Sequence, residues 1–383
     1  MQGFKNLIFY NVLSFILLYD GGCIGIVLKL IDISVHSFQL ISALGLNILF
    51  FLSKRLYYLK AYKRNLKILV VFGLFTLIYF FQTSFDNEYS IYKMELILFY
   101  YSQVLFLIPV IYSNRKIRLV LIYVLINILI RILYNYYYPQ EVEFLLEEDI
   151  QRLTFGEPII YSRLIGFGVL ICLFFLNKFK LILIPILIFA LTIISTRAIL
   201  FSTIGLVLFY VFRTNKKLSN AFKFISFLIS SFFVYILIEK YFNLLLKTRL
   251  VSLDGGGRLK MLEDSFLIFA NNPIFGSGVA SFSFNQSNVS NFNRIYPHNI
   301  ILELLSENGI IGFVLFTILI GIVIKSIQQN YNTVIRKFLL YFAFYSLVTS
   351  MFSLDLPNQF LIFNLIVLAT FCNNISDESF ISR

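Results

Sequence analysis

The chain has 383 residues, of which 59% are hydrophobic and only 14% are charged, and its mean hydropathy is +0.83. A soluble globular domain contains about 45–50% apolar and about 25% charged residues, so this composition excludes an ordinary soluble enzyme. The net charge of +12 would suit a nucleic-acid-binding protein, but the basic residues fall in short runs between apolar stretches. We therefore expect an integral protein that contacts membrane lipids and binds no nucleic acid.

Twelve apolar stretches follow one another along the chain, each near or above the length of about 20 residues that a membrane-spanning helix needs. They lie at about 6–31, 35–53, 66–83, 93–112, 117–138, 159–176, 181–196, 198–212, 221–239, 309–325, 338–354 and 358–373. No internal repeat and no Pro-rich or Gly/Ser-rich linker divides them. The sequence predicts an all-α integral membrane protein with about 12 transmembrane helices in a single polytopic domain, 1–383.

The loops between these stretches differ in charge, and the difference predicts the orientation of the chain. Cytoplasmic loops of membrane proteins accumulate Lys and Arg. If Lys5 is cytoplasmic, every second loop is basic, and the loops between them hold acidic residues such as Asp86 and Asp355. This alternation predicts a multi-pass protein with both termini in the cytoplasm and two longer segments outside, at about 139–158 and 240–308.

The outer segment at 240–308 is too long for a simple connection, because loops beyond about 12–15 residues are usually functional or disordered. Apolar residues recur in it at helical spacing, among them Met261, Phe266 and Phe269. We expect amphipathic helices that lie on the outer face of the membrane.

Arginines on the outer side are the residues that the topology rule leaves unexplained. They are Arg152, Arg163, Arg197, Arg249, Arg258 and Arg294. Arg197 follows Ser195 and Thr196 in a tight turn between two hydrophobic helices, where a charge is costly and marks a functional candidate. The alternative is a side chain that only reaches from a helix end to the polar interface.

Three consecutive glycines stand in the segment Asp254–Arg258, which precedes a helical stretch starting near Leu259. Glycines such as Gly256 and Gly257 let backbone N–H groups approach an anion, and a helix N-terminus adds partial positive charge. The guanidinium of Arg258 can hold phosphate oxygens in a bidentate fork. The pattern indicates a phosphate cradle, with a flexible turn before a helix as the alternative.

His298 is one of only two histidines and lies in the segment Tyr296–Asn299, at the end of the long outer loop. An imidazole can act as a base near neutral pH or donate to a phosphate. A structural histidine is the alternative. No cluster of Asp and Glu in the outer loops marks a metal site, so we expect a reaction that uses neither a metal nor another cofactor.

The order of these motifs resembles that of the O-antigen polymerase and O-antigen ligase family. In that family a Ser-Arg or Thr-Arg turn, a Gly-Arg in a large periplasmic loop, a P-x-F/L-G-x-G segment and an H-N-x-x-L-E-x-x-x-E-x-G-x-x-G run follow one another. Here Arg197, Arg258, the segment Pro273–Gly278 and the run His298–Gly312 match these places one by one. The resemblance covers about 150–325 specifically and the rest of the chain only by helix count.

Two details of the resemblance are weaker. The family often has Trp or another aromatic residue soon after the loop Gly-Arg, whereas this chain has the run Leu259–Met261. The stretch Arg152–Pro158 is loosely similar to one that the family places in its shorter outer loop. Arg152 and Arg163 therefore rank below Arg197, Arg258 and His298 as candidates.

The resemblance implies transfer of a glycan from an undecaprenyl-diphosphate carrier to an acceptor hydroxyl, at the periplasmic face of the bacterial inner membrane. Arg197 and Arg258 would hold the diphosphate, on which negative charge develops as it leaves, and His298 would orient it or take the proton of the acceptor. The further candidates for substrate binding are Arg152, Arg163, Gly256, Gly257, Asn299 and Glu303. The implied partners are the lipid-linked glycan, a chain-length regulator and a flippase.

Two activities share these motifs. A polymerase moves the growing chain onto another lipid-linked repeat unit, which builds O-antigen or capsular polysaccharide, whereas a ligase moves the finished chain onto lipid A-core. We favour the polymerase because each polysaccharide type needs its own and such sequences diverge widely. A flippase or other transporter is the alternative from a different class, but transporters usually show repeated halves and intramembrane charges near the midplane.

Overall fold

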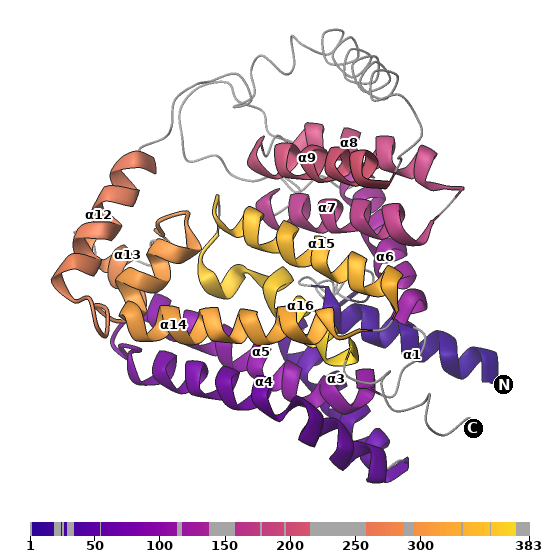
Figure 1. The fold of residues 1–383 in the computed structure, drawn as a ribbon, viewed down its shortest axis with the longest axis horizontal. Helices are drawn as coiled ribbons and strands as arrows, with labels where there is room; N and C mark the ends of the chain where they lie inside the picture. The colour runs from indigo at the N-terminus through magenta and orange to yellow at the C-terminus, as the bar shows by residue number, and fades with distance from the viewer. Residues whose placement is uncertain are drawn as a thin grey trace, which may run out of the picture. The chain divides into compact units, whose positions relative to one another are not determined.

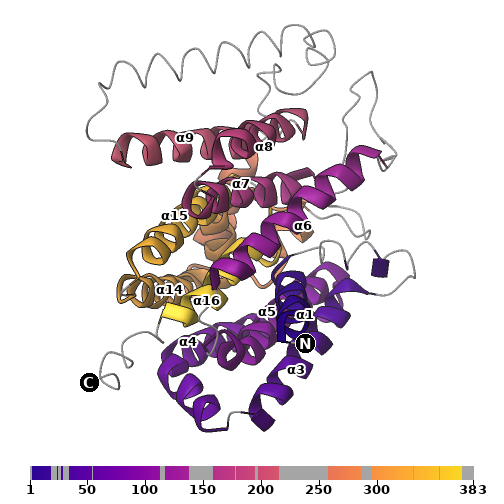
Figure 2. The same ribbon diagram turned by 90° about the vertical axis from the view of Figure 1, so that its right-hand side faces the viewer.

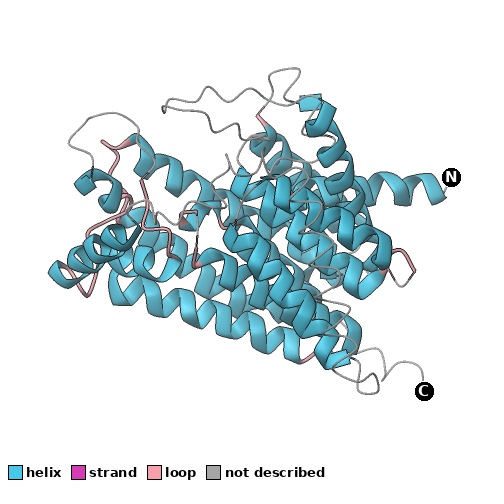
Figure 3. Ribbon diagram, turned by 90° about the horizontal axis from the view of Figure 1, so that it is seen from above, coloured by secondary structure: helices cyan, strands magenta, loops and turns pink. Residues whose placement is uncertain are grey.

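The computed structural model describes residues 2–18, 24, 27–28, 34–53, 55–112, 117–137, 158–176, 178–194, 197–214, 258–286, 295–330, 332–352 and 354–372. Every regular element in these ranges is a helix, and Figure 3 shows no strand among them. The all-α prediction is therefore confirmed for the described part of the chain. The predicted helix at 221–239 and the predicted outer loop at 139–158, except Pro158, lie outside it.

The helices follow the predicted apolar stretches closely. They are α1 (Gln2–Leu17), α3 (Val35–Ser53), α4 (Arg55–Phe81), α5 (Glu88–Tyr112), α6 (Ile117–Tyr137), α7 (Pro158–Phe175), α8 (Lys180–Ile194), α9 (Arg197–Thr214), α12 (Arg258–Asn271), α13 (Ser281–Gln286), α14 (Ile300–Gln328), α15 (Thr333–Ser350), η1 (Leu356–Asn358) and α16 (Phe360–Cys372). Most bounds agree with the prediction within a few residues, because an apolar run of spanning length is a strong helix signal. Two predicted starts are wrong: α4 begins at Arg55 instead of 66 and α14 at Ile300 instead of 309, because each helix begins in a polar stretch that an apolar run does not mark.

Membrane-spanning length is reached by several of these helices. In the described ranges, five are long and apolar enough to cross a membrane: Val35–Leu52, Leu59–Phe81, Glu88–Val110, Ile117–Tyr134 and Ile300–Gln328. Shorter apolar helices cover Ile159–Phe175, Lys180–Thr192, Ala198–Val211 and Phe360–Thr370. The chain is thus a multi-pass helical membrane protein, and the number of twelve spans stays a prediction.

The first helix ends earlier than its apolar composition suggests. Apolar residues continue over 6–31, but α1 stops at Leu17, so the prediction of one continuous helix is wrong there. The carbonyl groups of residues 15–18 accept hydrogen bonds from the side-chain amides of Gln39, Gln103 and Asn364, at 2.5–2.8 Å. These amides satisfy the carbonyl groups that a helix end leaves open, which is essential where no water is present.

The described residues form two compact units. One consists of Met1–Asn127 and Gly255–Arg383, and the other of Ile128–Asp254. In the first unit α14 packs against α4, α12 and α16, and α5 packs against α3, α4 and α16 (Figure 1). In the second unit α7 packs against both α8 and α9 (Figure 2). The prediction of a single domain stays a prediction.

Three connecting segments meet at one end of the first unit. Gln82, between α4 and α5, donates from its side chain to Phe275 O at 2.6 Å and accepts at its side-chain oxygen from Asn308 at 2.6 Å. Tyr89, at the start of α5, donates to Asp355, between α15 and α16, at 2.8 Å. The charge alternation predicts all three segments on the outer side, and their meeting at one end agrees with that prediction.

The amphipathic helix expected in the long loop is present as α12. Its Ser265 is buried and donates to Leu302 O of α14 at 3.2 Å. On its other side Phe266 and Leu267 are 58% and 61% exposed, and Phe275 beyond its end is 65% exposed. Large exposed apolar side chains suit a helix that lies at a membrane surface.

A break in α14 at Gly309 is filled by the segment 273–278. Gly309 has φ 64° and ψ −168°, which interrupts the helix. The carbonyl groups at 306–307 therefore lose their partners at 310–311 and accept instead from the backbone N–H groups at 277–278, at 2.9 and 3.0 Å. The N–H groups at 310–311 donate to the carbonyl groups at 273–274, at 2.9 and 3.3 Å. The loop thus replaces one turn of hydrogen bonds and locks the position of α14.

Gly276→Ala is expected to destabilise the protein strongly, because this glycine has φ 74° and an added Cβ would collide with the backbone of Glu307 and Asn308. The left-handed conformation alone costs about 1–2 kcal/mol for a residue with a Cβ, and the collision adds to this. Gly321→Ala is the matched control on α14, since nothing lies within 4 Å of the added atom. Thermal unfolding in detergent measures both; equal melting temperatures would contradict the proposed lock.

Candidate functional site

The helix α14 begins at the histidine motif, and Asn299 defines its start. Asn299 is the N-cap residue: its side-chain oxygen accepts from the N–H groups of Ile301 and Leu302 at 3.0 and 3.2 Å. Asparagine is among the preferred residues at this position because a short side chain with an oxygen can reach these N–H groups. The predicted substrate contact of Asn299 stays a prediction, but its oxygen already has a structural role.

His298 precedes the cap in an unusual backbone conformation. Its φ of 57° lies in the left-handed region, which residues with a Cβ occupy at a cost of order 1–3 kcal/mol and mainly where the surroundings enforce it, often at functional sites. The side chain is partly exposed, and its ring centroid lies 4.4 Å from that of Tyr296, with 60° between the planes. Because the cap of α14 is Asn299, capping is not the role of His298.

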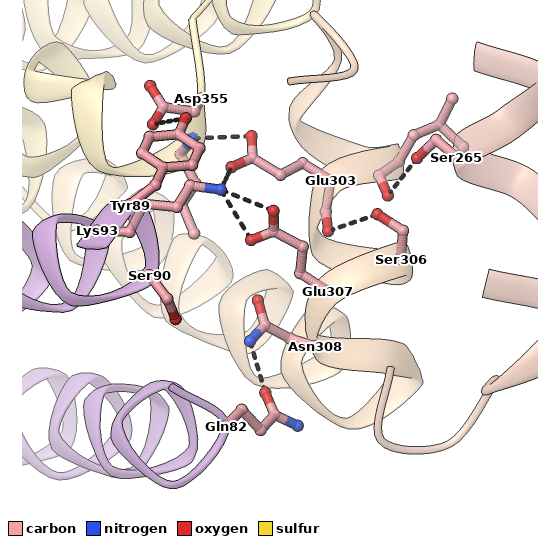
Figure 4. A network of polar contacts seen from close by, with 12 residues as sticks. Gln82, Tyr89, Ser90, Lys93, Ser265, Glu303, Ser306, Glu307, Asn308 and Asp355 are labelled. Atoms are coloured by element: carbon pink, nitrogen blue, oxygen red, sulfur yellow. Dashed lines mark hydrogen bonds and ion pairs between the residues drawn. The ribbon is translucent and has the colours of Figure 1, made fainter. Parts of the chain in front are cut away.

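Beyond the cap, two glutamates of the same motif bind one buried lysine (Figure 4). Lys93 Nζ of α5 lies 2.6 Å from Glu303 Oε1 and 2.8 Å from both carboxylate oxygens of Glu307. The side chains of Lys93, Glu303 and Glu307 are at most 2% exposed. Burying charges is costly unless they are paired and hydrogen-bonded, and here the three N–H groups of the ammonium match three carboxylate oxygens.

The α15–α16 connection completes this group, which we call the Lys93 network. The backbone N–H of Leu356 donates to Glu303 Oε2 at 2.8 Å. Asp355 is buried and accepts from Tyr89 OH at 2.8 Å and from Asn358 Nδ2 at 2.6 Å. Both oxygens of Glu303 and both oxygens of Asp355 therefore have donors. Two carboxylates bind the Lys93 ammonium, and the third, Asp355, is held by Tyr89 and Asn358.

No group of three or more His, Cys, Asp or Glu side chains in the described ranges could hold a metal ion. The carboxylates of the Lys93 network are engaged by Lys93, Tyr89, Asn358 and a backbone N–H. They are also buried, so they cannot reach a substrate without rearrangement. His298 is a partly exposed residue with acid-base chemistry directly before α14, and the Lys93 network holds the first turns of this helix.

Two of the sequence-predicted arginines stand at helix starts. Arg197 is the first residue of α9 and Arg258 the first of α12, but their side chains lie outside the described part. Arg152, Gly256 and Gly257 also lie outside it. Arg163 belongs to α7 and is only 1% exposed. Glu303 lies in the first turn of α14, where its N–H donates to Asn299 O, but its side chain points to Lys93. The role of the arginines stays a prediction.

The sequence reasoning missed Lys93, although a signal was present. Lys93 stands at the first position of the predicted helix 93–112, on the side predicted to be outside. The rule that singled out the outer arginines applies to it equally, because a lysine there is not explained by cytoplasmic topology. Glu307 carries a signal as well, because residues four apart in a helix share one face and Glu303 is a candidate site residue.

Comparison with known families covers the same region. Residues 181–317 match a family model described as O-antigen ligase. This range includes Arg197, Arg258, Pro273–Gly278 and His298–Gly312, the four motifs on which the resemblance rests. No curated protein matched the chain.

Proposed function

Because the chain belongs to the O-antigen polymerase and ligase family, we propose that it polymerises undecaprenyl-diphosphate-linked oligosaccharide repeat units into O-antigen or capsular polysaccharide. The observation that carries this proposal is the family match over 181–317, which encloses all four motifs in the family's order. The placement of His298 at the partly exposed start of α14 supports it.

The proposed reaction forms one glycosidic bond and breaks one bond to phosphate. The acceptor hydroxyl attacks the anomeric carbon of the donor, the bond from that carbon to the diphosphate oxygen breaks, and undecaprenyl diphosphate leaves with the bond electrons. His298 takes the hydroxyl proton or holds the diphosphate. Arg197 and Arg258 stabilise the negative charge that develops on the leaving group, which fixed cations do best in a site shielded from water. We expect inversion at the anomeric carbon.

The proposed location is the periplasmic face of the bacterial inner membrane, with both termini in the cytoplasm. The alternation of basic and acidic loops supports this orientation. Three segments predicted to lie outside meet at one end of the first unit, which is consistent with this orientation. They contain Gln82, Phe275 and Asp355. A flippase that delivers lipid-linked units and a chain-length regulator are the proposed partners at that face.

A ligase is the second candidate, because the matching family model is described as O-antigen ligase. The two activities use the same donor and differ in the acceptor, which is a lipid-linked repeat unit for the polymerase and lipid A-core for the ligase. We favour the polymerase because each polysaccharide type requires its own and such sequences diverge widely.

Deletion of the gene distinguishes a polymerase from a ligase by the length of the glycan that remains on the undecaprenyl carrier. A polymerase is needed to build chains, so we expect a deletion strain to hold single repeat units on the carrier and a plasmid copy to restore long chains. Mass spectrometry of the extracted lipid-linked glycans measures this. Long chains that accumulate on the carrier would instead identify a ligase, and an unchanged glycan profile would contradict both.

A further inference from the structure

The Lys93 network joins three segments of the first unit that are distant in sequence. Lys93 belongs to α5, Glu303 and Glu307 to α14, and the N–H of Leu356 to the α15–α16 connection. The two ion pairs bridge sequence separations of 210 and 214 residues. A contact of this kind fixes the distance between α5 and the start of α14, because the ammonium needs all three oxygens within hydrogen-bonding range.

The first turns of α14 are held from a second direction as well. Glu303 and Glu307 point toward α5 (Figure 4), while the carbonyl groups at 306–307 accept from the N–H groups at 277–278, at 2.9 and 3.0 Å. Between them these contacts leave the short helical piece 300–308 little freedom to rotate or slide. His298 lies directly before this piece, so its position follows from the position of the piece.

Stability alone is a weak reason for such a network. Replacing a buried ion pair by apolar residues of similar volume is often neutral or stabilising, whereas fixing register is among the best-attested uses of buried polar groups. The backbone of His298, with φ 57°, also has to be held by its surroundings. Both considerations indicate that the network serves to hold the backbone geometry at His298.

We infer that Lys93 is a positioning residue for glycan transfer. It holds Glu303 and Glu307 at one distance from α5 and thereby sets where the imidazole of His298 stands relative to the donor. Lys93 does not touch the substrate, since its side chain is fully buried. This inference rests on the proposed function and adds a residue outside the four motifs to its machinery.

The test removes the charges of Lys93, Glu303 and Glu307 together, while buried Asp355 keeps its donors Tyr89 and Asn358. Lys93→Met alone leaves two buried glutamates without their cation and is expected to lower both the melting temperature and turnover. The combined variant Lys93→Met/Glu303→Gln/Glu307→Gln is neutral at these three positions and similar in volume, so its melting temperature is expected to return close to that of the wild type. Its kcat is nevertheless expected to stay about 100-fold low, because a misplacement of about 1 Å has an effect of this size.

Three measurements on purified protein accompany each variant: the melting temperature, the extension of lipid-linked repeat units, and the binding of undecaprenyl diphosphate. We expect undecaprenyl diphosphate to bind to the combined variant within about twofold of the wild-type affinity, a difference below about 0.4 kcal/mol. Glu95→Gln is the matched control on α5, because Glu95 lies two positions from Lys93 and is exposed. It is expected to keep wild-type turnover.

Two results would overturn the inference. Wild-type kcat in the folded combined variant would reduce the network to a structural role, and loss of undecaprenyl diphosphate binding would make it part of the binding site. If the combined variant does not fold, Lys93→Arg is the alternative test, because it keeps the charge with a different shape. A lower kcat at unchanged donor KM would support the positioning role. An unchanged kcat would contradict it. Failure of the wild type itself to extend lipid-linked units would instead refute the proposed function.

Discussion

His298→Asn is expected to lose nearly all turnover while it still binds the lipid-linked donor. Asparagine keeps one hydrogen bond but cannot accept a proton at neutral pH, and a general base contributes about 10²–10⁴-fold to the rate. Asparagine also tolerates the left-handed region well, so the backbone of residue 298, with φ 57°, should persist. Extension of lipid-linked repeat units, binding of undecaprenyl diphosphate and the melting temperature together measure the effect.

The second histidine supplies the control for this substitution. His36 lies on α3 and its ring nitrogen is 3.2 Å from the Gln39 side-chain oxygen, away from the start of α14. His36→Asn should therefore keep its turnover. Weaker donor binding with some residual turnover in His298→Asn would identify a phosphate ligand in place of a base, and normal turnover would remove His298 from the site.

Arg197→Ala and Arg258→Ala are each expected to reduce glycan extension by about 10²–10³-fold, the loss typical when a fixed donor to a developing negative charge is removed. Both proteins should remain in the membrane, because each residue only begins a helix. Arg258→Lys should restore activity partly, since an ammonium cannot reproduce the two parallel hydrogen bonds of a guanidinium. Turnover per folded molecule, measured with lipid-linked repeat units, gives the result.

Arg336→Ala is the control for the arginine variants. Arg336 lies in α15, in a basic segment predicted to face the cytoplasm, and should be dispensable for extension. If Arg258→Lys were fully active, the charge of residue 258 would matter only for topology or general attraction. Equal losses in Arg336→Ala and Arg258→Ala would also speak against a specific diphosphate contact.

Helix positions could be read from the sequence because each depends on a local property. The stretch 35–53 became α3 with the same bounds, and the helical spacing around Phe266 became α12. Local composition could not place the end of α1 at Leu17. The carbonyl groups at this helix end accept from side-chain amides of three helices that are distant in sequence. Likewise, a run of apolar residues after Gly309 gives no sign that the helix starts at Ile300 and breaks in between.

The candidate site divides in the same way. His298 and Asn299 belong to a contiguous motif, so their closeness to each other is predictable from the sequence. The partner of Glu303 and Glu307 was not, because Lys93 is 210 residues away from Glu303 and only the fold brings them together. The signal in the sequence is the lysine on the predicted outer side, which belongs to no short motif.

We propose above all that this protein makes a glycosidic bond from a lipid-diphosphate donor. The most direct measurement incubates the purified protein with undecaprenyl-diphosphate-linked repeat units and follows glycan length together with released undecaprenyl diphosphate. We expect longer glycans and one undecaprenyl diphosphate for each bond formed, and neither product with His298→Asn. Repeat units that stay unconsumed, or that only cross the membrane of a vesicle without bond formation, would contradict it.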